Sequence, residues 1–134
     1  MKVGKVFMLI GLVVLVLSLA ACEVSFSTAN IGDAWMSNDE AGKNRTTVFA
    51  PDEVFYAQVN LRNAPDDTKL KAVWTAVEAE SVEPNYVINE TEFVSGSGQV
   101  LFNLSNTNPW PAGKYKVDIY LNDKVAKTLE FEVR

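Results

Sequence analysis

The sequence of 134 residues contains no histidine and only one cysteine, Cys22. Without histidine, a Ser-His or Cys-His nucleophile cannot form, and zinc sites built from cysteine and histidine are excluded. A single cysteine also excludes an intramolecular disulfide, so a folded domain must be stable through packing alone. Catalysis by a Ser-Lys pair or by paired carboxylates remains open, and no cofactor is predicted.

Positive charge is scarce as well. All 17 acidic residues but only 10 of the 12 basic residues follow residue 21, which gives residues 22–134 a formal net charge of −7. An acidic domain repels phosphate backbones and anionic headgroups. Nucleic acid is therefore not expected as a partner.

The N-terminal segment has the layout of a secretory signal. Lys2 and Lys5 precede an uncharged, mostly apolar run over residues 6–21, as in a signal peptide. As a helix this run would span about 24 Å, which is shorter than the hydrocarbon core of about 30 Å. We predict a signal peptide over residues 1–21, and the alternative is an uncleaved anchor helix.

The only cysteine stands at the end of this apolar run. The stretch Leu19-Ala20-Ala21-Cys22 resembles the lipobox of bacterial lipoproteins, in which a diacylglyceryl group is attached to the thiol and cleavage leaves the cysteine first. An ordinary secretory cleavage after Ala20 also fits, but it would leave a lone thiol near a secreted N-terminus. The resemblance implies lipidation of Cys22, whose acyl chains would anchor the protein stably to a membrane of the bacterial cell envelope, outside the cytoplasm.

The remaining residues read as one domain of short strands. Turn signals recur at short intervals, and between them apolar and polar residues alternate with the period of a half-buried strand. The alternation is clear over residues 55–61, 100–104, 115–121 and 129–133. We expect residues 22–30 to form a tether or a first strand, and residues 31–134 to form a single all-β sandwich.

Two turns predict hairpins. Asn122-Asp123 separates the last two alternating segments and predicts a hairpin with one solvated face. Ser95-Gly96-Ser97-Gly98 predicts another hairpin turn, because its glycines permit a tight reversal and no helix follows it as a phosphate-binding loop requires.

The segment 69–80 fits two patterns. Leu70, Val73, Trp74 and Val77 have helical spacing, whereas Leu70, Ala72, Trp74 and Ala76 have the spacing of a strand. We prefer the strand, because a lone helix would interrupt the pairing of its neighbours.

The stretch WPAGKYKVDIY, residues 110–120, resembles the tyrosine corner of immunoglobulin-like domains. The resemblance implies that the Tyr115 hydroxyl bonds to the backbone upstream and that Trp74 is the buried tryptophan of the third strand. Val117 stands where antibody domains have their second cysteine, so the similarity is to disulfide-free domains of the fibronectin type III kind. Residues 26–134 as a whole resemble small bacterial lipoproteins with such a domain. This implies an antiparallel sandwich of about seven strands and transfers no catalytic residue.

Aromatic side chains are the candidate ligand contacts, because exposed Trp and Tyr anchor interfaces and sugar sites. Trp35 and Met36, beside an acidic loop, are expected to be exposed. Tyr56 and Tyr120 are expected on the outward faces of strands. Trp110 lies between two prolines and could either plug one end of the sandwich or bind. The candidate binding surface is Trp35, Tyr56, Trp110 and Tyr120.

Acidic residues also form candidate clusters. Glu130 and Glu132 would point to one strand face about 7 Å apart, a separation found in glycosidases. Asp33 and the stretch 37–40 could crowd oxygens around calcium but lack the pattern of a calcium loop. We expect a solvated face and a polar loop, and predict neither a catalytic residue nor a metal ligand.

These features predict a non-catalytic binding module of the cell envelope whose partner is another envelope protein. One alternative is a carbohydrate-binding module that holds glycan on Trp35, Trp110 or Tyr120. A less favoured alternative is a glycan hydrolase that uses carboxylates.

Overall fold

The computed structural model describes residues 28–134. The predicted signal peptide, residues 1–21, and the predicted lipidation site, Cys22, lie outside these residues. Within them, no helix has the length and apolar character needed to cross a membrane. Eight strands are present: β1 (Asn30–Ser37), β2 (Val48–Phe49), β3 (Phe55–Arg62), β4 (Thr68–Ala79), β5 (Tyr86–Ser95), β6 (Gly98–Leu104), β7 (Gly113–Leu121) and β8 (Lys124–Val133).

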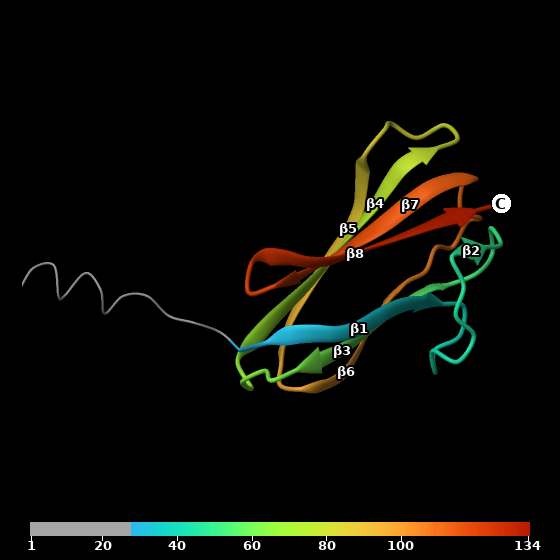
Figure 1. The fold of residues 1–134 in the computed structure, drawn as a ribbon. Helices are drawn as coiled ribbons and strands as arrows, with labels where there is room; N and C mark the ends of the chain where they lie inside the picture. Colours follow the sequence, from blue (N-terminus) through green and yellow to red (C-terminus); the bar gives the residue numbers. More distant parts are fainter. Residues whose placement is uncertain (1–27) are drawn as a thin grey trace, which may run out of the picture.

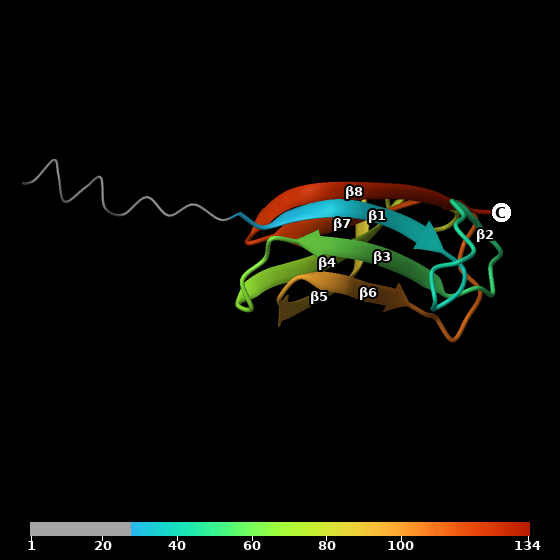
Figure 2. The same cartoon turned by 60° about the horizontal axis from the view of Figure 1, so that its bottom comes forward.

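The strands form two sheets that pack face to face (Figure 1). The small sheet has the order β1-β3-β6, and the large sheet has the order β2-β8-β7-β4-β5. Figure 2 turns the small sheet toward the viewer. The predicted all-β sandwich is confirmed. The strand beyond the expected seven is the two-residue β2, which pairs with β8 in the parallel direction.

Residues 69–79 of the ambiguous segment lie in β4, an interior strand of the described large sheet next to the edge strand β5. β4 pairs with β5 on one side and with β7 on the other, so the sheet supplies its backbone hydrogen bonds. Leu70, Ala72 and Trp74 face the core, and Val73 on the outer face is also buried. Because Val73 adds a buried apolar residue on the outer face of this strand, the sequence also fitted the spacing of a helix.

The core between the sheets is centred on Phe55. Its ring centroid lies 4.6 Å from that of Trp110, 4.7 Å from that of Phe131 and 5.0 Å from that of Phe49. Trp74 also contacts this group and is 1% exposed. The predicted core position of Trp74 is thus confirmed, and stacked and edge-to-face rings fill the end of the sandwich near β2.

The predicted tyrosine corner is present. The Tyr115 hydroxyl donates a hydrogen bond of 2.5 Å to the carbonyl oxygen of Pro111, and burial raises the pKa of Tyr115. Gly113 permits the corner, because its φ is +153° and a Cβ there would collide with the carbonyl oxygen of Glu78. Val117 is fully buried opposite Trp74, so an apolar side chain occupies the place of the cysteine.

One of the two predicted hairpins forms. Asn122 and Asp123 both have positive φ, of 47° and 70°, as a type I′ turn between β7 and β8 requires. The hairpin prediction for residues 95–98 was wrong. These residues carry the chain from β5 in the large sheet to β6 in the small sheet. Both flanking strands turn a phenylalanine toward the core, and Phe93 and Phe102 contact each other across the sheets.

The described chain enters the sandwich at one end and leaves it at the other (Figure 1). At the entry end, the Thr28 hydroxyl donates to the carbonyl oxygen of Asn63, and the amide of Ala64 donates to the Ser97 hydroxyl. The β3–β4 and β5–β6 connections therefore lie beside Thr28, and we call this the Thr28 end. Arg134 marks the opposite end.

Candidate functional site

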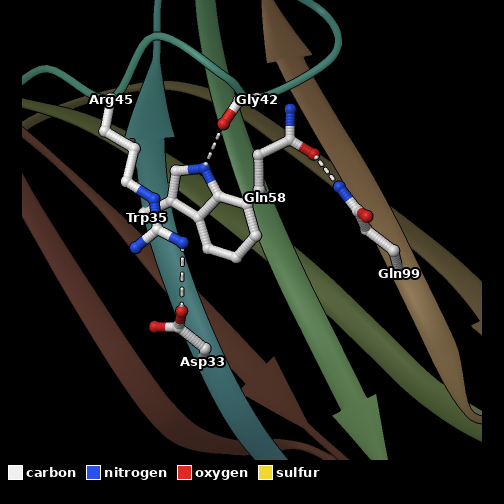
Figure 3. Close-up of polar contacts among 6 residues, drawn as sticks. All are labelled: Asp33, Trp35, Gly42, Arg45, Gln58 and Gln99. Carbon is white, nitrogen blue, oxygen red and sulfur yellow. Dashed lines mark hydrogen bonds and ion pairs between the residues drawn. The ribbon is translucent and has the colours of Figure 1, made fainter.

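Trp35 lies on β1 with its ring on the outer face of the small sheet (Figure 3). Its indole nitrogen donates a hydrogen bond of 2.9 Å to the carbonyl oxygen of Gly42. The guanidinium carbon of Arg45 lies 3.9 Å from the ring centroid, and Arg45 also contacts Asp33 at 3.4 Å. The segment that follows β1 therefore folds back over Trp35, and a ligand that stacked on this ring face would have to displace Arg45.

Asp39 organises this returning segment, residues 38–45. Its two carboxylate oxygens accept hydrogen bonds from the backbone N–H groups of Lys43, at 3.0 Å, and Asn44, at 2.9 Å. The hydrogen bond from Asn44 is the largest cause of the lowered pKa of Asp39, with that from Lys43 adding to it against the opposing effect of desolvation. The carboxylate thus caps a loop, as its short side chain allows.

Two glutamines attach the same segment to the middle of the small sheet. Gln99 on β6 donates a hydrogen bond of 2.7 Å to the side-chain oxygen of Gln58 on β3, and Gln58 donates one of 2.9 Å to the carbonyl oxygen of Glu40. Gln58 is only 1% exposed. Gly42 has a φ of +72°, and a Cβ there would lie 2.8 Å from the Gln58 side chain. Residues 38–45 therefore lie close against the sheet.

A surface groove of about 660 Å³ runs between β1 and β8. Its lining includes Trp35 and Arg45 on one side and Lys127 and Glu130 on the other. The lining is mixed in charge and open to solvent, so the groove can accept a polar ligand.

Of the two alternatives left open for Trp110, the structure shows the plug, and the exposure expected for Met36 was wrong. Trp110 is 6% exposed, its ring stacks on Phe55, and its indole nitrogen donates to the carbonyl oxygen of Glu53. It plugs the end of the sandwich and cannot hold a ligand. Met36 is 3% exposed because it faces the core, on the opposite side of β1 from Trp35.

The remaining predicted residues do not form one surface. Tyr56 is half-buried on the outer face of the small sheet, where it pairs with Ser37 and Asn103. Tyr120 is half-buried on the large sheet, and the Lys71 ammonium lies 4.4 Å from its ring centroid. The structure thus separates Tyr120 from the pair Trp35 and Tyr56.

The acidic candidates are either occupied or exposed. Asp33 contacts Arg45, and Asp39 is bonded to the backbone as described above. Glu132 forms an ion pair of 2.7 Å with Arg134, and Glu130 and Glu132 border an open hollow of about 410 Å³. Within residues 28–134 no group of three His, Cys, Asp or Glu side chains is arranged to hold a metal.

Three features of this region were not found from the sequence. They are the stacking of Arg45 on Trp35, the hydrogen-bonded pair Gln58 and Gln99, and the open edge of β5. Gln58 and Gln99 alternate with apolar residues, so they read as a solvated face. No sequence signal showed that residues 38–45 fold back over that face. The edge of β5 depends on which strands pair, which local patterns do not specify.

No protein family matches the chain, and no curated protein does. Among solved structures, an immunoglobulin-like protein from Pseudomonas aeruginosa is similar to it, with 16% identity, a TM-score of 0.56, and coverage of 83% of this chain and 100% of that chain. The chain has an immunoglobulin-like fold.

The same fold occurs as a part of larger proteins. The alkylpurine DNA glycosylase AlkC from Pseudomonas fluorescens is 14% identical, with a TM-score of 0.54 over 81% of this chain and 31% of that chain. A β-glucosidase from Listeria innocua is 14% identical, with a TM-score of 0.52 over 82% of this chain and 17% of that chain. The immunoglobulin-like chain thus spans less than a third of either enzyme, and at these identities the likeness shows the fold alone.

Proposed function

We propose that this chain is a lipid-anchored module of the bacterial cell envelope that binds another envelope protein and catalyses no reaction. The lipobox-like stretch Leu19-Ala20-Ala21-Cys22 supports the anchor. The immunoglobulin-like fold fits a binding module, because a sandwich offers strand edges and loops to partners.

The anchor would orient the domain. Five residues lie between Cys22 and Thr28, so the six residue steps from one to the other reach only about 20 Å even when fully extended. The Thr28 end of the sandwich would therefore face the membrane. The edges of the sheets and the end that carries Arg134 would be turned toward partners.

The proposal of a protein partner rests on a contrast: the aromatic candidates are buried or covered, whereas the edge of β5 is open. Trp110 is in the core, and Arg45 and Lys71 cover the rings of Trp35 and Tyr120. In contrast, β5 pairs only with β4, and its second edge has no strand partner within residues 28–134. An open edge offers main-chain hydrogen bonds, which a polypeptide can satisfy.

Cross-linking of the native protein in its own membranes, followed by identification of the attached molecules by mass spectrometry, tests this function. We expect one dominant protein partner. Turnover of a substrate by the purified protein, or recovery of glycan without protein, would contradict the proposal.

A separate test addresses the anchor. Cells grown with radioactive palmitate should label the wild-type protein and not the Cys22→Ser variant, which should leave the membrane fraction. A membrane-bound, unlabelled wild-type protein would favour the uncleaved anchor helix.

A glycan-binding role is the second candidate, favoured by the groove between β1 and β8. Its volume lies within the range of small-ligand sites. Retention on immobilised envelope glycans should then weaken in the Lys127→Ala variant and remain in Lys124→Ala, which changes a lysine outside the lining. Equal retention by both variants would remove this candidate.

A further inference from the structure

β5 is an edge strand of the large sheet. It pairs with β4 on one side, and no strand within the described residues pairs with its other side. A register shift near Ile88 divides it, and residues 89–95 form an unbroken ladder with β4. Along these residues the outer edge is open to a further strand.

The edge lacks the strongest of the features that usually prevent pairing. Natural edge strands are protected by charged side chains, above all lysine, by proline or by bulges. β5 contains neither lysine nor proline, and its bulge lies before the regular part. Five large apolar side chains are exposed in the described part of the chain, and three of them belong to β5: Tyr86, Val87 and Val94.

The outer face of β5 is acidic. Glu90 and Glu92 share this face with Val94, because side chains alternate along a strand. Lys71 lies opposite Glu92 on β4, but its ammonium group lies over the ring of Tyr120 and forms no ion pair with Glu92. Both glutamates are exposed and form no ion pair within residues 28–134, so they attract basic side chains on an adjacent strand.

The inner face of β5 carries one large apolar side chain, Phe93, among polar residues. Phe93 points between the sheets, is half-buried, and has its ring centroid 5.0 Å from that of Phe102 on β6. β6 is the edge strand of the small sheet. The edges of β5 and β6 thus lie on the same side of the sandwich. A strand added to β5 would place its inward side chains over Phe93 on that side.

We propose that the edge of β5 binds an extended segment of a protein partner in which basic and apolar residues alternate. This inference rests on the proposed protein-binding function and names the chemistry of the partner. Basic side chains lie beside Glu90 and Glu92, apolar side chains cover Phe93, and the main chain extends the ladder of residues 89–95. A second copy of this chain is a poorer occupant. Antiparallel pairing centred on Thr91 would set Glu90 of each copy opposite Glu92 of the other.

The test uses the full chain in nanodiscs of zwitterionic phosphatidylcholine, which has no net charge to attract a basic peptide. The probes are fluorescent eight-residue peptides that alternate lysine with valine or glutamate with valine, and binding is followed by anisotropy. We expect the lysine peptide to bind at least about tenfold more tightly than the glutamate peptide. Hydrogen exchange of the amides of residues 86–95 should slow when it binds.

A matched pair of variants locates the site. The double variant Glu90→Lys with Glu92→Lys should reverse the preference between the two peptides. The control, Glu78→Lys with Glu80→Lys, makes the same charge change at two exposed glutamates outside β5 and should retain binding within about twofold. Equal losses in both variants would show a general charge effect and overturn the proposal.

A third comparison tests the main-chain ladder. Two lysine-valine peptides are methylated on alternate amide nitrogens, so that each lacks the N–H donors of one edge. At least one of the two should bind at least about tenfold more weakly than the unmethylated peptide. If both bind like the parent peptide, attraction between charges explains binding and no strand is added.

Three further outcomes decide between the possible occupants of the edge. Dimers of the full chain in which β5 amides are already protected would show that a second copy occupies the edge, and would overturn the proposal. If the partner cross-linked in native membranes is retained by the Glu90→Lys, Glu92→Lys variant, the binding function stands but β5 is not its site. If no protein partner is found at all, the proposed function itself fails.

Discussion

The Tyr115 hydroxyl donates a hydrogen bond of 2.5 Å to the carbonyl oxygen of Pro111, four residues earlier in the chain. The bond closes the loop that leads from the small sheet into β7. It also positions Trp110, whose backbone N–H donates to the carbonyl oxygen of Pro51. One local contact thus joins β7 to the aromatic end of the core.

Replacement of Tyr115 by phenylalanine should reduce the free energy of unfolding by about 1 to 2 kcal/mol, because the carbonyl oxygen of Pro111 loses its donor. Urea denaturation measures the change. Tyr56→Phe is the control, because the Tyr56 hydroxyl forms no hydrogen bond with any of residues 28–134, and it should change stability by less than about 0.5 kcal/mol. Equal effects would show that the corner bond contributes nothing specific.

Trp110→Ala should reduce the free energy of unfolding by about 3 to 5 kcal/mol, since it leaves a cavity beside Phe55. The expected cost distinguishes a core residue from a ligand contact. Val125→Ala, which truncates an exposed apolar side chain, should have little effect in the same thermal or urea measurement. A stable Trp110→Ala protein would contradict the core assignment.

Arg45→Ala should expose the ring of Trp35 and increase quenching of tryptophan fluorescence by acrylamide. The change can be assigned to Trp35, because Trp74 and Trp110 are buried. Stability should fall by less than about 1 kcal/mol, as expected for an exposed cation–π contact and ion pair. The control Arg134→Ala removes an arginine that pairs with Glu132. Quenching that did not rise above this control would show that Arg45 leaves the ring open.

The Asp39 carboxylate should make stability depend on pH in the acidic range. Its pKa in the folded state lies below the ordinary value of 3.8, so it stabilises the fold above that value and loses this effect as the pH falls through the folded pKa. Asp39→Asn should therefore destabilise the protein at neutral pH, and the difference from wild type should shrink below about pH 4.

Denaturation at several pH values measures this difference, and an NMR titration of the Asp39 carboxyl measures its pKa directly. Asp52→Asn, which removes an exposed carboxylate, serves as the control. A carboxyl of Asp39 that titrates at or above its ordinary value would show that the bonds to Lys43 and Asn44 do not persist in solution.

Local patterns predicted much of the fold because they reflect local physics. The alternation in residues 115–121 and 129–133 marks strands with one buried face, and Asn122-Asp123 can adopt the positive φ that a hairpin turn needs. The tyrosine corner was also recognisable, because Tyr115, Gly113 and Pro111 lie within five residues of one another. The segment 69–80 was ambiguous, because Val73 is buried on the outer face of an interior strand.

The candidate site was predicted less well, because exposure depends on contacts distant in the sequence. Met36 was expected at the surface from its neighbours in the chain, and Trp110 was left open between a plug and a ligand contact, but rings and strands distant in the sequence bury both. The same limit applies to residues 95–98. Their glycines allow the chain to reverse, but only the packing of Phe93 and Phe102 decides that the reversal joins two sheets.

By itself, the sequence determined the lack of histidine chemistry, the lack of an internal disulfide, the acidic charge and the period-two strands. These properties depend on residue types or on neighbours a few positions apart. Only the tertiary structure decided which faces and edges are open, because the cover of Trp35 by Arg45 and the unpaired edge of β5 depend on how distant segments pack. The candidate binding surface belongs to this second group, since a strand edge is free or occupied only in the assembled sheet.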